Sequence, residues 1–139
     1  MVHRTLGVSV FVVLISIAGA QAQEPDTKAA KVAADTWLTL VDTGNYAQSW
    51  ETAATFFKNA VPSERWQAAA NTARSPFGGF KSRTLKSATT ATTLPGAPDG
   101  EYVVFDFDAT YEKKSAAAER VTVVREKDGS WRVVGYFIK

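Results

Sequence analysis

The sequence contains no cysteine, and its single histidine, His3, lies in an N-terminal segment that resembles a cleaved export signal. The absence of cysteine excludes disulfides, cysteine nucleophiles and thiolate metal ligands. Once the N-terminal segment is removed, the chain has no imidazole either, which excludes histidine-based proton relays and nearly all zinc sites. We therefore expect no metal and no cofactor, and the sequence assigns no catalytic residue.

The chain also lacks a strong excess of charge of either sign. The sequence has sixteen Lys and Arg residues and fourteen Asp and Glu residues, and the two signs are interspersed along it. Proteins that bind nucleic acid or anionic lipid through electrostatics carry a clear basic excess. We therefore expect no nucleic-acid partner and no membrane-surface partner.

Long hydrophobic runs are absent except for one near the N-terminus, over residues 6–18. A membrane-spanning helix needs about 20 apolar residues, so this run is short for a permanent anchor, the alternative interpretation. A basic start precedes it, and Ala20-Gln21-Ala22 follows as a small-residue cleavage site. Residues 1–22 are therefore predicted to be a signal peptide, and the protein is predicted to be periplasmic or secreted. Residues 23–139 are predicted to form a single domain.

The first half of this domain predicts three helices, over residues 27–42, 46–60 and 63–75. Alanines and one tryptophan recur at helical spacing in each of them. Gly44 is suited to end the first helix and Pro62 to open the third. The three tryptophans are Trp37, Trp50 and Trp66.

The second half predicts four strands, with clear alternation of apolar and polar residues over 101–111 and weak alternation over 80–93. Asp128-Gly129 is typical of a two-residue hairpin, which would place Val121 opposite Tyr136 and Val124 opposite Val133. Helices followed by an antiparallel meander predict an α+β fold, with three helices packed on a curved four-stranded sheet, as in the cystatin-like cone. The predicted strands cover residues 80–93, 101–111, 119–127 and 130–138.

Four ordered sequence blocks span almost the whole domain and resemble the bacterial secreted family called domain of unknown function 4019. The resemblance implies a nuclear-transport-factor-like cone and a periplasmic or secreted setting. It implies no known activity. The blocks are Trp37-Leu38-x-Leu40-Val41-Asp42-x-Gly44-x-Tyr46-x-x-Ser49-Trp50, Arg74-Ser75-Pro76-Phe77-Gly78, Leu94-Pro95-Gly96-Ala97-Pro98-Asp99-Gly100-Glu101-Tyr102 and Asp128-Gly129-x-Trp131-x-Val133-x-Gly135-Tyr136-Phe137-Ile138.

Two pairs of charged residues are the candidates for chemistry. Asp106 and Asp108 point to the same side of one strand and could act as an acid–base pair or hold a cation. Alternation places them opposite the apolar residues, so a solvated position is the favoured interpretation. Arg74 and Arg83 could clamp an anion, although pairing with a nearby carboxylate is the more common role of such arginines. The candidate ligand-binding residues are Trp50, Arg74, Arg83 and Tyr136.

Three functions remain open from the sequence. The favoured one is a non-enzymatic exported module that binds an unknown protein or small molecule. The alternatives are a cone that holds an apolar or anionic small molecule, and an isomerase- or lyase-type enzyme that uses a cavity carboxylate. The last hairpin carries apolar residues on both of its predicted faces, with Phe137 on one and Tyr136 on the other. This pattern also favours a homodimer.

We predict that the exported protein begins at Gln23. Cleavage after Ala22 follows from the short apolar run and the small residues at its end. Intact-mass measurement of the protein recovered from the periplasm or medium tests this. A mass that retains Met1 to Ala22 would show that the segment is an anchor.

Overall fold

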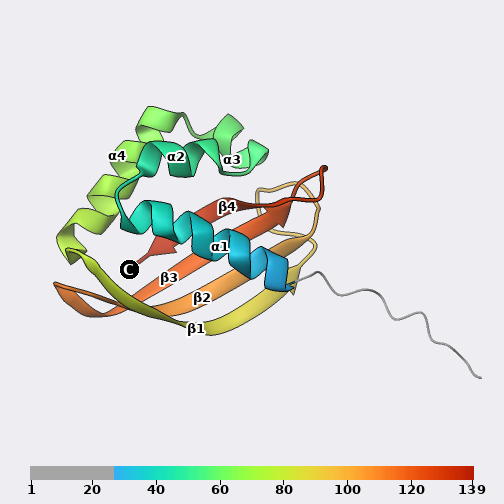
Figure 1. The fold of residues 1–139 in the computed structure, drawn as a ribbon. Helices are drawn as coiled ribbons and strands as arrows, with labels where there is room; N and C mark the ends of the chain where they lie inside the picture. Colours follow the sequence, from blue (N-terminus) through green and yellow to red (C-terminus); the bar gives the residue numbers. More distant parts are fainter. Residues whose placement is uncertain (1–26) are drawn as a thin grey trace, which may run out of the picture.

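The computed structural model describes residues 27–139, and the predicted signal peptide lies outside these residues. The described part has the predicted α+β architecture, with helices first and one antiparallel sheet after them (Figure 1). None of its helices is long and apolar enough to cross a membrane. The elements are α1 (Thr27–Asp42), α2 (Tyr46–Glu51), α3 (Thr55–Ala60), α4 (Ser63–Arg74), the short 3-10 helix η1 (Ser75–Phe77), β1 (Phe80–Ala91), β2 (Tyr102–Tyr111), β3 (Lys114–Arg125) and β4 (Trp131–Ile138).

The four strands form a meander in the order β1-β2-β3-β4, and the sheet is curved. Figure 1 shows the helices gathered on one side of it, where α1 packs against β2, β3 and β4 while α2 packs against α1 and α4. We call the side covered by helices the inner face and the opposite side the outer face. Because strand side chains alternate, each strand sends half of its residues into the core and half to the outer face.

The predicted helix over 46–60 is divided into α2 and α3, so the helix layer contains four α-helices rather than three. The chain leaves the helical path after Glu51, and Ala53 and Ala54 are completely buried. There the Ala54 amide donates a hydrogen bond to the Val133 carbonyl of β4 at 2.8 Å. This contact with the sheet takes the place of a continued helix. The two residues of this contact are far apart in the sequence, so helical spacing within 46–60 could not predict it.

The tryptophans of α1 and α4 meet in the core around one buried serine. The Trp37 indole donates to the Ser49 carbonyl at 2.9 Å, and the Trp66 indole donates to the Ser49 hydroxyl at 2.9 Å. The hydroxyl itself donates to the Tyr46 carbonyl at 2.6 Å. Both indole N–H groups are therefore satisfied inside an otherwise apolar core, as buried tryptophans require.

The register of the last hairpin corrects the sequence prediction. Val121 lies opposite Tyr136 as predicted, but Val124 lies opposite Arg132, and the pairing shifts between Thr122 and Val123. The shift is a β-bulge at Val134. The sequence prediction assumed a hairpin with regular pairing and therefore had no bulge. The loop is also longer than two residues, since the Glu126 amide donates to the Ser130 carbonyl.

The bulge changes which residues share a face. Trp131 and Val133, predicted to lie on the opposite side from Tyr136, pack with it in the inner core. Phe137 stays on the outer face beside Arg120. The hairpin is therefore much less apolar on its outer face than the sequence indicated.

Candidate functional site

Five polar side chains from five different elements meet beneath the helix layer, and we call them the buried ionic cluster. Asp42 ends α1 and Arg74 ends α4, while Arg83, Glu119 and Tyr136 come from β1, β3 and β4. The three strand residues point to the inner face, and the ends of the two helices point toward them. Two arginines and two carboxylates give the cluster a formal charge of zero.

Arg83 holds both carboxylates. Its Nη1 and Nη2 donate to the two oxygens of Asp42 at 2.8 and 3.0 Å. Its Nε and Nη2 donate to Oε1 of Glu119 at 3.0 and 2.7 Å. The planar guanidinium thus makes a bidentate pair with Asp42 and a second fork to Glu119, a geometry that lysine could not reproduce.

Arg74 and Tyr136 close the network from the other side. Arg74 Nη2 donates to Asp42 Oδ1 at 2.7 Å, and its Nη1 donates to the Tyr136 hydroxyl at 3.1 Å. The Tyr136 hydroxyl donates to Glu119 Oε2 at 2.5 Å, and Arg74 Nη1 lies 3.6 Å from the same oxygen. All four carboxylate oxygens therefore have a partner.

Aromatic rings surround the cluster and keep it from water. The Arg83 guanidinium lies 4.1 Å from the Phe80 ring centroid, and that of Arg74 lies 5.1 Å from the Tyr111 centroid. Such contacts favour a cation over a ring face. The Tyr111 hydroxyl is buried beside the cluster and, within residues 27–139, is the buried side-chain polar atom without a hydrogen-bond partner.

Burial determines the ionisation of the tyrosines. The Glu119 side chain is 0% exposed and that of Arg74 is 6% exposed. Burial, together with the negative charge of Glu119, raises the pKa of Tyr136 and of Tyr111 well above the ordinary value. For Arg83, burial alone acts to lower the pKa, but its bonds to Asp42 and Glu119 raise it overall. The phenols of Tyr136 in the cluster and of Tyr111 beside it therefore stay neutral next to two charged arginines.

This arrangement stabilises the fold and leaves little capacity for chemistry. A general base needs a free carboxylate oxygen within reach of a substrate proton. Here the oxygens of Asp42 and Glu119 are all occupied by arginine or tyrosine donors. In residues 27–139, no group of three or more His, Cys, Asp or Glu side chains is arranged to hold a metal ion.

Three of the four candidate ligand-binding residues lie together in this cluster, namely Arg74, Arg83 and Tyr136. The fourth, Trp50, lies elsewhere, and its indole donates to the Val61 carbonyl at 2.7 Å. The sequence reasoning missed Asp42 and Glu119. A signal for Glu119 was available, because a charged residue on the buried, alternating face of a strand requires a buried partner.

Asp106 and Asp108 lie on the outer face, as the favoured interpretation of the sequence held. Asp106 accepts hydrogen bonds from Arg120 at 2.8 and 3.2 Å, and this pairing lowers its pKa. Asp108 is exposed. The two aspartates face away from the helix layer, so they cannot act on a molecule held inside it.

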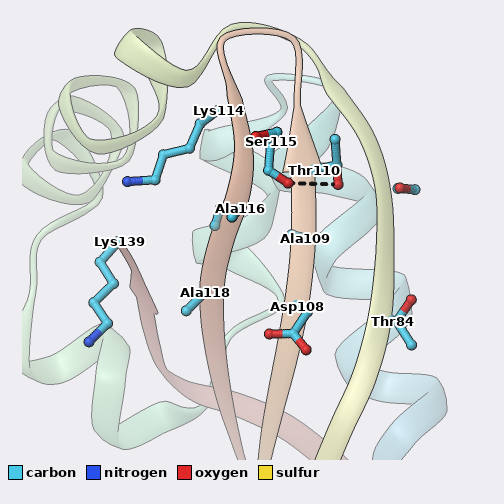
Figure 2. A pocket seen from close by; sticks show the side chains of 11 residues that line it. Thr84, Asp108, Ala109, Thr110, Lys114, Ser115, Ala116, Ala118 and Lys139 are labelled. Atoms are coloured by element: carbon cyan, nitrogen blue, oxygen red, sulfur yellow. Dashed lines mark hydrogen bonds between the residues drawn. The ribbon is translucent and has the colours of Figure 1, made fainter.

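Open hollows lie on the outer face. One of about 550 Å³ extends from β1 across β2 and β3, and Figure 2 shows Asp108, Ala118 and Lys139 on its floor and rim. A second hollow of about 450 Å³ adjoins it, shares Ala118 and Lys139, and has Phe137 in its wall. The first hollow forms where β3 has small outward side chains, such as Ala116 and Ala118.

A third hollow, of about 720 Å³, is a groove between α3, the loop before β2 and the loop that joins β3 to β4. Tyr102, Val124 and Val134 provide apolar lining. The charged lining residues are of both signs: Lys58, Arg125, Lys127 and Arg132 against Asp99, Glu126 and Asp128. The Tyr102 hydroxyl donates to the Pro98 carbonyl, which fixes the loop that forms one wall.

The fold and the cluster define an α+β cone with an ionic interior. The family model described as "Protein of unknown function (DUF4019)" matches residues 33–136, and the chain belongs to this family. The match confirms the resemblance stated from the sequence blocks.

Among solved structures, the chain is similar to Aln2 from a Streptomyces species, with a TM-score of 0.52 and 15% sequence identity. The alignment covers 86% of this chain and 93% of that one. At this identity the likeness shows the fold alone. No curated protein matches the chain in sequence.

We predict that Glu119→Gln lowers the free energy of unfolding by about 3–5 kcal/mol, because it leaves two buried guanidiniums against one carboxylate. Urea denaturation measures this. Glu101→Gln is the matched control, since Glu101 forms an exposed pair with Arg125 at 3.2 Å. Exposed pairs contribute about 0–1 kcal/mol. Equal losses in both variants would contradict the role given to the cluster.

We also predict that stability falls as the pH rises above about 10. The unfolded tyrosines release their protons there, while Tyr136 and Tyr111, whose pKa is raised in the native state, keep theirs. A group with a raised native pKa stabilises the fold below its unfolded pKa and loses that contribution above it. The slope should approach ~1.4 kcal/mol per pH unit for each tyrosine. Tyr136→Phe should make it shallower, and an unchanged slope would contradict the assignment.

Proposed function

We propose that this chain is an exported, non-enzymatic interaction module that binds a protein partner through the outer face of its sheet. The observation that carries the proposal is the division of roles between the two faces. The inner face is packed with the core tryptophans and the buried ionic cluster, whereas adjoining hollows and an exposed phenylalanine, Phe137, lie on the outer face. The export part of the proposal rests on the sequence pattern of residues 1–22.

The pairing of the buried carboxylates with arginines also supports a non-enzymatic function. An isomerase or lyase of the cavity-carboxylate kind needs a carboxylate that faces a substrate space. The buried carboxylates Asp42 and Glu119 are held by two arginines, and the exposed Asp108 faces outward. Neither position provides a base inside an enclosed, water-free pocket.

The small-molecule alternative is supported by a different observation, the groove beside α3. Its lining is apolar in part and has four basic residues against three acidic ones, which would suit an apolar molecule with an anionic group placed beside Lys58 and Arg132. This groove is separate from the inner core, so it would not make the cone interior a ligand cavity.

In-cell photo-crosslinking tests the proposal. We predict that p-benzoylphenylalanine at Thr122, in the middle of β3 and paired with Val104 and Gly135, forms protein adducts in the producing bacterium. The matched control is the same substitution at Thr39, which is exposed on α1 on the helix side. Adducts should form at Thr122 and not at Thr39, because the partner covers the outer face.

Absence of adducts at Thr122, or equal adducts at both positions, would overturn the outer-face proposal. If native mass spectrometry of the same material then shows a retained small molecule that is lost in Lys58→Glu, the groove beside α3 would replace the outer face as the binding site.

A further inference from the structure

We propose that the partner of the outer face is a second copy of this chain, docked sheet to sheet about a two-fold axis that runs along β3. This inference rests on the proposed function and names its partner. Sheets pack face to face at about 10 Å, which requires small side chains where they approach most closely. Three features of the outer face meet the requirements of such a self-complementary contact.

The first feature is the line of small residues on the proposed axis. Ala116 and Ala118 point outward from β3 into the hollow drawn in Figure 2, with Thr110 and Thr84 on the neighbouring strands. Arg120, the next outward residue of β3, is bound to Asp106 on β2. Two copies can bring their β3 strands close together at the two alanines, since each alanine faces the same alanine of the partner.

The second feature is a pair of opposite charges placed symmetrically about that line. Asp108 pairs across the sheet with Ala118, and Ala118 is hydrogen-bonded to Lys139 on its other side. The three residues therefore form one row, with Asp108 and Lys139 on opposite sides of β3. Within residues 27–139, neither Asp108 nor Lys139 has an ion-pair partner.

A two-fold rotation about β3 exchanges the two sides of that row. It places Asp108 of one protomer against the partner's Lys139, and Lys139 against the partner's Asp108. The dimer would therefore contain two Asp108–Lys139 pairs, one on each side of the axis. This charge complementarity favours a second copy over an unrelated partner, because the face supplies the counter-charges that it needs.

The third feature is Phe137, which is 57% exposed and is a large hydrophobic side chain in the wall of the second hollow. Phe137 lies opposite Arg120, which is bound to Asp106. The same rotation places the Phe137 ring over the partner's Asp106–Arg120 pair, where it can stack on the guanidinium. The contact would remove the ring from water in both copies.

The test is a reciprocal charge exchange measured by sedimentation equilibrium and light scattering at micromolar concentration. We expect the wild-type protein to have twice the mass of one chain. Asp108→Lys and Lys139→Asp should each weaken the dimer by about tenfold or more, because each places like charges together at two sites. The double variant, Asp108→Lys with Lys139→Asp, should restore the wild-type affinity.

A matched pair of phenylalanine variants adds an independent measurement. Phe137→Glu should weaken the dimer by about tenfold or more, since it removes the apolar contact and the stacking of the ring on the partner's Arg120. Phe56→Glu is the control, because Phe56 is also exposed, at 42%, but lies on α3. Far-UV circular dichroism checks folding, and the charge exchange decides the question if Phe137→Glu unfolds.

A monomeric wild-type protein, single variants that dimerise normally, or a double variant that stays monomeric would each overturn the inference. Its failure is distinguishable from failure of the proposed function. Photo-adducts at Thr122 with a mass other than twice the chain would reject the second copy and keep the interaction module. No adduct at Thr122 would reject both.

Discussion

The fold depends on the mutual neutralisation of four buried charges. An isolated buried charge is far too costly to keep, and a buried pair is tolerated only when its remaining hydrogen-bonding capacity is met. Arg74 and Arg83 meet this requirement together with Asp42 and Glu119, because each arginine contacts both carboxylates. The charges belong to α1, α4, β1 and β3, so the network is complete only when the helix layer and the sheet are both in place.

This constraint also determines what the interior can do. The two carboxylates that lie deepest in the protein are used entirely in binding arginine and tyrosine donors. The space beside them is filled by the rings of Phe80, Tyr111 and Tyr136. An interior built in this way holds the helices on the sheet.

The sequence predicted the features that depend on local periodicity. The ends of α1 and α4 and the alternation of β2 followed from residue spacing, and Gly44 has the positive φ of 79° that its position after α1 suggested. Arg74, Arg83 and Tyr136 were also found as candidates, but their convergence was not. Asp42 and Arg83 are 41 residues apart in the sequence, and spacing within one element contains no information on such a contact.

The bulge at Val134 links the two faces of the protein. A regular hairpin would have placed Trp131 and Val133 on the opposite side from Tyr136, leaving the core incomplete and the outer face strongly apolar. The extra residue turns Trp131 and Val133 inward, so that they join Tyr136 under the helices. Phe137 remains outside, next to the small residues of β3. One backbone irregularity thus completes the inner core and leaves the outer face with a single exposed ring on a largely polar surface, which suits a reversible contact better than a permanent one.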